Sequence, residues 1–501
     1  MPSVKISHPD EKEPVADLGA AAIVSHAPTQ LFIGGEWIDA ANRKTFDVVD
    51  PSTEGVIATV SDGEISDAIA AVDAADAASR AWKATSARHR SDILMKCFHL
   101  MLEHAEWLAK LITVENGKAL SDAKSEVTYA AEFFRWYAEE AVRSSGEFGS
   151  APSGANQIIV SHEPIGIAVL VTPWNFPAAM ATRKMAPALA AGCTCILKPA
   201  AETPLTALAI GDIMRQAGVP AGVVNIVTTK NAGPLVSAML HDKRVRKLSF
   251  TGSTNVGRTL LREAADQVIS CSMELGGNAP FIVFDDADVE AAVAGAMIAK
   301  MRNGGEACTA ANRFYVQRGI ATEFTRRLAE EMSVLKVGPG LASGTQLGPL
   351  ITRAAVEKVG RLVDDAVAKG ASLETGGNRL NGDGFYYQPT VLSNVSSDAE
   401  MLDEEIFGPV APIIQFETED DVVQLANDTE YGLVSYVFSG NLKRALAVAG
   451  RLESGMVGIN RGVVSDAAAP FGGMKQSGLG REGSHHGMQE YLETKYVAVS
   501  W

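Results

Sequence analysis

Short apolar runs alternate with helix-like segments along the middle of the chain. The run at 165–173, IGIAVLVTP, shows no polar alternation, and a helical pattern follows at 177–191. Continuous apolar strands between helices are typical of a parallel sheet covered on both faces. The pattern therefore predicts an α/β fold with a Rossmann-like nucleotide-binding sheet. Its further strands are expected at 193–199, 222–228, 246–252 and 268–275.

A second alternating block begins near residue 280 with the run FIVFDD. A helix is predicted at 289–301, a strand at 313–317 and a helix at 321–332, and the alternation continues to about residue 460. This block predicts a second α/β domain. Ahead of the first block, helical periodicity covers 65–84, and helix-like sequence continues to about residue 144.

The remaining segments lack this alternation. Residues 1–29 mix charge, proline and alanine, which predicts a mobile arm or an edge element. Residues 151–164 are polar and β-rich and predict an exposed hairpin or extension. The tail, 487–501, ends in YLETKYVAVSW and has no obvious partner in its own neighbourhood. Such tails often pair with another subunit.

Composition narrows the class of protein. A chain of 501 residues with 47% hydrophobic and 21% charged residues predicts a soluble protein of two or three domains. The net charge of −16 gives no support for nucleic-acid binding. We see neither a secretory signal nor a transmembrane run. The five cysteines have no zinc-type spacing, so we expect a reduced, cytoplasmic protein without a metal.

Three polar side chains could support chemistry at a carbonyl group. They are Cys308 in NGGEACTAANR, Glu274 in MELGGNAP and Asn175 in TPWNFP. A thiolate can attack a carbonyl carbon, a carboxylate can act as a base, and an amide can donate a hydrogen bond to an oxyanion. Taken singly, each has a plainer structural interpretation: a buried thiol, a salt-bridging glutamate and an asparagine in a turn.

Together the motifs are more specific. TPWNFP, LKPA, FTGSTNVG, MELGGNAP, GEAC and EEIFGP occur in this order, and from about residue 30 the chain resembles the NAD(P)-dependent aldehyde dehydrogenase superfamily. The resemblance implies a homodimer or homotetramer with a β-rich oligomerisation extension. The implied parts are an arm at 1–29, a cofactor-binding domain at 30–150 and 165–276, a catalytic domain at 277–473, and oligomerisation strands at 151–164 and 487–501.

The resemblance also implies roles for single residues. Cys308 matches the nucleophile, Glu274 the general base and Asn175 the oxyanion-hole amide. An aldehyde would then be oxidised to an acid through a thiohemiacetal and a thioester on the cysteine. The residues that match the cofactor site are Thr172, Trp174, Lys198, Ala201, Gly252, Ser253, Gly257, Glu405 and Phe407.

The substrate is indicated by a closer similarity to succinate-semialdehyde dehydrogenases. Arg183, Arg302 and Ser465 match an anion-binding site in that subfamily, and two arginines with a hydroxyl suit a distal carboxylate. The alternative is that each arginine makes a structural ion pair. Glutarate semialdehyde, one methylene longer, is a close competitor, because a methylene is worth only about 1–3 kcal/mol of discrimination. Other ω-acid semialdehydes stay open.

Two departures from the subfamily pattern carry predictions. Ala310 stands where many members have a second cysteine, so we expect no disulfide switch at Cys308. Ala201 stands where NAD-selective members place a glutamate, which leaves space for a 2′-phosphate with Lys198 as its counter-charge. We therefore expect NADP as the cofactor, with NAD open because Glu202 comes next.

Two other functions are alternatives on this fold. A CoA-acylating dehydrogenase would need no water-activating base, so Glu274 argues against it. A non-enzymatic binding protein on this fold would be expected to lack Cys308, Glu274 or Asn175, and all three are present.

Overall fold

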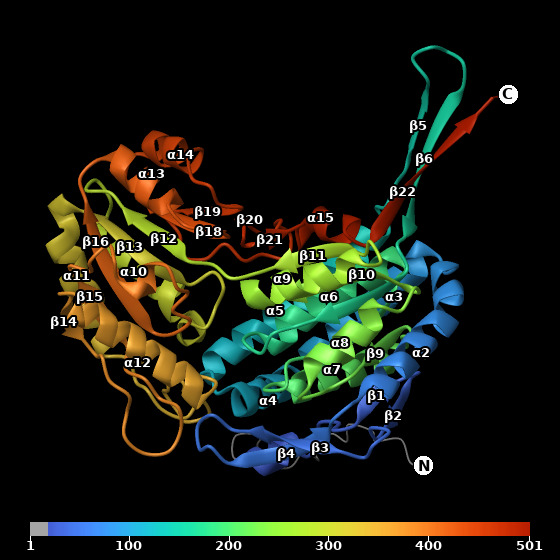
Figure 1. The fold of residues 1–501 in the computed structure, drawn as a ribbon, viewed down its shortest axis with the longest axis horizontal. Coiled ribbons are helices and arrows are strands. Elements are labelled where there is room, and N and C mark those ends of the chain that lie inside the picture. Colours follow the sequence, from blue (N-terminus) through green and yellow to red (C-terminus); the bar gives the residue numbers. More distant parts are fainter. Residues whose placement is uncertain (1–18, 501) are drawn as a thin grey trace.

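Two separate sheets organise the chain, as the two alternating blocks predicted (Figure 1). The computed structural model describes residues 19–500. The first sheet has eight strands in the order β2-β1-β9-β8-β7-β10-β11-β21, and its central five, from β9 to β11, are parallel. The strands are β1 (Leu31–Ile33), β2 (Glu36–Ile38), β7 (Ile167–Val171), β8 (Thr194–Lys198), β9 (Val224–Ile226), β10 (Val245–Thr251), β11 (Ser270–Glu274) and β21 (Gly478–Leu479).

Helices cover both faces of this sheet. The central one, α6, is buried along its whole length; it begins with Pro177 at its first position and ends at Gly192, whose φ of 96° suits a left-handed cap. It packs against α5 and presents its first turn to the end of β7. The helices of this unit are α2 (Ile65–Lys83), α3 (Ala87–Glu103), α4 (Ala105–Asn116), α5 (Leu120–Ala141), α6 (Pro177–Ala191), α7 (Pro204–Ala217), α8 (Ala232–Leu240), α9 (Thr254–Ala265) and α15 (Ser484–Gln489).

The second sheet has seven strands in the order β14-β15-β16-β13-β12-β18-β19, and only its edge strand β14 is antiparallel. The phenylalanines of its core lie on β12, β13, β18 and α11, and Phe281 stacks on Phe438 at 4.9 Å. The elements are β12 (Ala279–Val283), α10 (Val289–Met301), η2 (Arg302–Gly305), β13 (Ala311–Gln317), α11 (Arg318–Ser333), α12 (Arg353–Ala368), β14 (Ser372–Thr375), β15 (Thr390–Ser393), η3 (Glu400–Leu402), β16 (Val410–Phe416), α13 (Glu419–Asn427), β18 (Val434–Phe438), α14 (Leu442–Ala449) and β19 (Met456–Ile459).

A three-stranded sheet projects from the first unit and provides a strand partner for the tail (Figure 1). Strand β22 (Leu492–Val499) pairs along its whole length with β6 (Gln157–Pro164) of the same chain, so the tail's partner is internal. The hairpin begins with β5 (Glu147–Ser150), a few residues earlier than predicted. Trp501 lies outside the described residues. Two short two-stranded sheets complete the fold: β3 (Thr45–Val49) with β4 (Val56–Ser61), and β17 (Tyr431–Gly432) with β20 (Met474–Lys475).

The last part of the predicted N-terminal arm is packed against the first unit. Residues 20–24 form the short helix α1 (Ala20–Val24), whose Ile23 and Val24 are buried. The indole of Trp107 on α4 donates a hydrogen bond of 3.0 Å to the Ile23 carbonyl. These residues are therefore a packed element rather than a mobile arm, and residues 1–18 lie outside the described part. Across residues 19–500, no helix is both long and apolar enough to cross a membrane.

Candidate active site

Asn175 lies in the loop between β7 and α6, at the carboxyl end of the first sheet, where ligands bind in open α/β folds. Its side-chain Nδ2 donates to the Glu306 carbonyl at 3.0 Å, which leaves its second N–H available. Its backbone carbonyl accepts from Lys118 Nζ at 2.7 Å and from Asn303 Nδ2 at 2.9 Å. The loop is therefore held from two sides.

Cys308 follows a tight turn made by η2. Asn303, Gly304 and Gly305 have φ values of 54°, 61° and 78°, all in the left-handed region. A Cβ on Gly305 would lie 2.2 Å from the Gly408 carbonyl oxygen, so only glycine fits there. The turn leaves Cys308 partly exposed, and it lines the same cavity as Asn175.

The surroundings of Cys308 oppose ionisation of its thiol. Burial raises its pKa to about 12; the charges of Glu405 and Glu274 act in the same direction, while Arg183 and Arg302 lower it. A thiol with a raised pKa is mostly protonated at neutral pH, so attack on a carbonyl needs a base to take its proton.

Glu274 is the last residue of β11 and is only 2% exposed. Within residues 19–500, neither of its carboxylate oxygens has a hydrogen-bond partner. Burial raises its pKa well above the usual range, Glu482 adds to the effect, and Arg183 opposes it. A buried carboxyl group without partners has the properties of a general base.

The Glu274 segment lies directly against the Cys308 turn. A Cβ on Gly277 would sit 2.5 Å from the Cys308 carbonyl oxygen, and one on Gly472 would sit 2.8 Å from Glu274 Oε1. The glycines of MELGG therefore allow a close approach of two segments from different sheets. Glu274 itself does not line the cavity that contains Cys308 and Asn175.

That cavity, of about 400 Å³, runs along the carboxyl ends of the first sheet. Five of the nine predicted cofactor residues line it: Trp174, Gly252, Ser253, Glu405 and Phe407. The rings of Trp174 and Phe407 meet edge to face at 5.4 Å. Ser253 caps the amino end of α9, where backbone N–H groups favour phosphate. An aromatic wall and a helix amino terminus fit a dinucleotide.

The other four predicted cofactor residues lie outside this lining. The backbone N–H of Thr172 donates to the Lys198 carbonyl at 3.2 Å, which places both at neighbouring strand ends; Ala201 follows shortly after. Gly257 is inside α9, and a Cβ there would lie 2.4 Å from Leu275, so its lack of a side chain allows the helix to pack closely. Its role in cofactor binding stays a prediction.

A second cavity, of about 580 Å³, holds two of the three predicted substrate residues, Arg302 and Ser465. Arg302 Nη1 lies 3.5 Å from Ser465 Oγ, and its guanidinium stacks over the Phe176 ring at 4.8 Å. No carboxylate of residues 19–500 makes an ion pair with Arg302. Phe176 lines this cavity and Asn175 lines the first, so two residues adjacent in the chain separate the two cavities.

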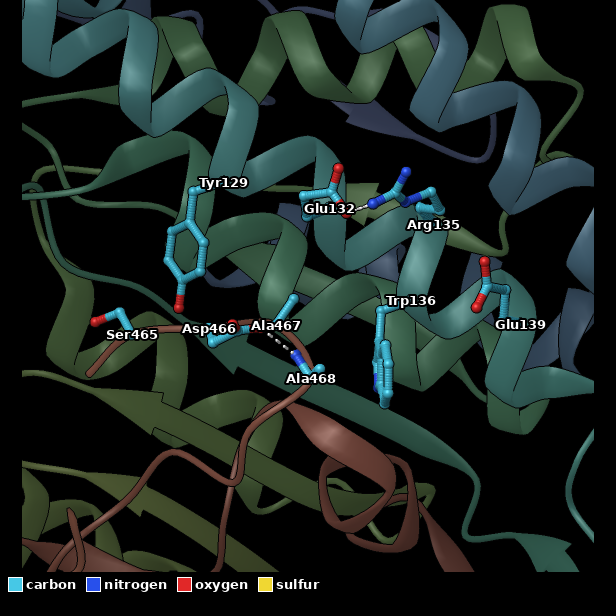
Figure 2. Close-up of a pocket in the computed structure, with 9 residues that line it drawn as sticks. All are labelled: Tyr129, Glu132, Arg135, Trp136, Glu139, Ser465, Asp466, Ala467 and Ala468. Carbon is cyan, nitrogen blue, oxygen red and sulfur yellow. Dashed lines mark hydrogen bonds and ion pairs between the residues drawn. The ribbon is translucent and has the colours of Figure 1, made fainter. Parts of the chain in front are cut away.

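A smaller hollow adjoins the second cavity and shares Tyr129 and Ser465 with it. Figure 2 shows Tyr129 and Trp136 pointing from α5 toward residues 465–468, while Arg135 turns to Glu132. That ion pair measures 2.6 Å. The positive charge of Arg135 is thus neutralised outside the cavity that contains Arg302.

Arg183 has different surroundings from Arg302. It is 1% exposed, lines neither cavity and is ion-paired through Nε with Glu482 Oε2 at 2.6 Å. Its role in substrate binding stays a prediction. Burial raises the pKa of Tyr129, and both arginines oppose that effect, so Arg183 still acts electrostatically on the second cavity.

Several residues at the site carry no motif that sequence reasoning could use. The buried pair Lys118–Glu126, at 2.6 Å, supports the Asn175 loop, and Glu482 binds both Arg183 and Lys184. Lys358 lines the first cavity and donates to the Glu405 carbonyl at 2.6 Å. The contacts of Lys118 with Asn175, of Glu482 with Arg183 and of Lys358 with Glu405 join distant segments, so only the tertiary fold reveals them.

Comparisons with known proteins agree with this geometry. The family model described as "Aldehyde dehydrogenase family" matches residues 37–497. A succinate-semialdehyde dehydrogenase of Paenarthrobacter nicotinovorans is 52% identical, covering 89% of this chain and 99% of the relative. A glutarate-semialdehyde dehydrogenase of Pseudomonas putida is 49% identical, covering 94% and 98%.

Solved structures match over the same extent. The crystal structure of an E. coli NADP-dependent enzyme superposes with a TM-score of 0.94 at 47% identity, covering 95% of this chain and 98% of that one. The likeness therefore spans both sheets and both cavities.

Proposed function

Because the chain belongs to the aldehyde dehydrogenase family, we propose that it oxidises succinate semialdehyde to succinate with a nicotinamide dinucleotide. The observation that carries the proposal is Arg302, which faces a cavity near Cys308 with a hydroxyl at 3.5 Å and without a carboxylate ion-paired to it in the described part of the chain. An unpaired, partly desolvated guanidinium favours binding of a substrate carboxylate. The names of the similar proteins support the same substrate class.

The first step joins substrate and enzyme. We assign Cys308 as the nucleophile: its proton passes to solvent water, which reaches the partly exposed thiol, the C–S bond forms, and the carbonyl oxygen becomes an oxyanion. The free N–H of Asn175 Nδ2 and the backbone N–H of Cys308 donate to that oxygen. A dinucleotide bound along Trp174 and Phe407 would supply the hydride acceptor.

The second step releases the product. Loss of hydride leaves a thioester on Cys308. Glu274 takes a proton from water, the resulting hydroxide attacks the thioester carbon, and the C–S bond breaks to give the acid and the thiol. The buried and unpartnered carboxyl group of Glu274 supports this assignment. It also disfavours acyl transfer to CoA, which needs no water-activating base.

We further propose that NADP is the preferred cofactor, because the small side chain of Ala201 leaves room for a 2′-phosphate near Lys198. Burial lowers the pKa of Lys198, and the charge of Glu202 opposes this effect. We expect Ala201→Glu to raise KM for NADP by roughly 10-fold or more and to leave KM for NAD nearly unchanged, because a carboxylate repels a 2′-phosphate. Steady-state kinetics with both cofactors check this. Glu202→Gln is the control. If only that variant changes KM for NADP, Glu202 determines the preference between NADP and NAD.

The substrate class is tested at Arg302. We expect Arg302→Met to lower kcat/KM for succinate semialdehyde by roughly 10- to 100-fold, the value of a hydrogen bond to a charged group, and to leave butanal almost unaffected. Arg135→Met is the matched control, because it removes the same charge from the adjoining hollow, where Arg135 is already paired with Glu132. Equal losses for both aldehydes would contradict the proposed carboxylate contact.

Glutarate semialdehyde is the second candidate, favoured by the similarity to the P. putida enzyme. The second cavity, at about 580 Å³, has room for one more methylene. We keep succinate semialdehyde first because the relative from P. nicotinovorans is slightly more similar.

We also propose a cytoplasmic homo-oligomer. All five cysteines are unpaired, which suits a reducing compartment. In the projecting sheet, β5 and β22 each leave one edge without a strand partner among residues 19–500, and the exposed rings of Phe148 and Tyr496 lie on these strands. Open edges with exposed apolar groups favour pairing with another subunit.

A further inference from the structure

We propose that Asn303 is a positioning residue for the reaction, which acts by holding the amide of Asn175 where the substrate oxyanion forms. The inference rests on the proposed function, because it presupposes that Asn175 stabilises that oxyanion. Asn303 is 2% exposed and touches neither substrate nor cofactor in the arrangement derived above.

The contacts of Asn303 converge on Asn175. Its Nδ2 donates to the Asn175 carbonyl at 2.9 Å and to the Glu306 carbonyl at 3.0 Å. Asn175 Nδ2 donates to the same Glu306 carbonyl at 3.0 Å. One oxygen atom therefore fixes both amides, and Asn303 holds the backbone of Asn175 while Glu306 orients its side chain.

The position of Asn303 is fixed independently of Asn175. Its backbone N–H donates to Asp122 Oδ2 at 3.0 Å, and its φ of 54° lies in the left-handed region. Asparagine tolerates this conformation better than most residues do. The Asp122 contact involves only the backbone, so a change of the Asn303 side chain can leave the turn in place.

Lys118 is the second donor to the Asn175 carbonyl. Its Nζ also donates to the Asn175 carbonyl, at 2.7 Å, while it is ion-paired with Glu126. Glu126 Oε1 in turn accepts the backbone N–H of Ala178 at 2.8 Å, in the first turn of α6. Lys118 and Asn303 thus hold one carbonyl from two sides. Loss of the Asn303 donors leaves Lys118 as the single partner of this carbonyl among residues 19–500, so the backbone of Asn175 can shift.

A double-mutant cycle tests this role. Asn303→Asp keeps the shape and the left-handed tolerance but replaces both N–H donors with an acceptor. We expect kcat to fall roughly 10- to 100-fold, the range for a misplaced catalytic group, with KM for the aldehyde and for NADP within about threefold of wild type. In the Asn175→Ala background, which alone should cost roughly 10²–10³ in kcat, the same substitution should cost less than about threefold.

Asn303→Gly is the second variant, because it keeps the backbone conformation and removes the side chain; it should repeat the same pattern if Asn303→Asp fails to fold. The inference would be overturned if the Asn303 substitution lowered kcat by the same factor with and without Asn175→Ala, if it changed only KM, or if it left kcat unchanged. The double-mutant cycle is measured with the aldehyde that the wild-type enzyme oxidises best. If that aldehyde is uncharged, the proposed substrate is refuted, but the cycle still tests the role of Asn303. A wild-type protein that oxidises no aldehyde would overturn both.

Discussion

Cys308→Ala is expected to abolish aldehyde oxidation, lowering kcat by roughly 10⁴-fold or more, as loss of a covalent nucleophile does in other enzymes. The reason is that no thiohemiacetal can form, so the substrate carbon does not become a hydride donor. Binding of NADP should persist, because most of the cavity lining is contributed by other residues. Steady-state assays and a fluorescence titration with NADPH measure the two effects separately.

Cys271→Ala is the matched control. Cys271 is also partly exposed but lies on β11, outside the lining of the first cavity, so its loss should leave turnover near the wild-type value. Wild-type-like turnover in Cys308→Ala would contradict the assignment.

Peroxide should inactivate the wild-type enzyme without a disulfide to position 310, because Ala310 provides no thiol; mass spectrometry of the treated protein shows the outcome.

Glu274→Gln is expected to separate the two halves of the reaction. The first turnover should still release about one equivalent of NADPH per active site, and the following steady state should be slower by roughly 10²–10⁴-fold, the usual contribution of a general base. The thioester then accumulates on Cys308 and can be trapped with hydroxylamine. Rapid mixing followed by mass spectrometry measures the burst and the acylated enzyme.

The pH dependence gives an independent check. Burial raises the pKa of Glu274 well above its usual range, so the fraction in the basic form increases with pH, and hydrolysis of the thioester should accelerate as pH rises. Glu274→Gln should lose this rise. A variant that loses the burst as well would show that Glu274 acts before the thioester forms. Rapid release of acyl-CoA on addition of CoA to the wild-type enzyme would favour the acylating alternative.

The local periodicity of the sequence predicts most of the two sheets because each element buries an apolar stripe of its own. The helix expected at 65–84 is α2 (Ile65–Lys83), and that expected at 289–301 is α10 (Val289–Met301). The family assignment is likewise confirmed, since its motifs are short and contiguous. These features are set by residues close together in the chain.

Contacts between distant segments could not be predicted. The strand partner of the tail, β6, lies in the middle of the sequence. The ion-pair partner of Arg183, Glu482, lies near the end of the chain. The packing of α1 depends on Trp107 in the same way. Pairings of this kind are decided by the tertiary fold, and no local pattern encodes them.

We propose that the substrate is an aldehyde with a distal carboxylate, which binds Arg302 near Cys308. The most direct test is a comparison of kcat/KM for succinate semialdehyde, glutarate semialdehyde and butanal on the wild-type enzyme with NADP. We expect kcat/KM for succinate semialdehyde to exceed that for butanal by roughly 10- to 100-fold. The kcat/KM values for succinate and glutarate semialdehyde should differ by at most roughly 10- to 200-fold, the effect of one methylene. A kcat/KM for butanal equal to or above that for both semialdehydes would contradict the claim.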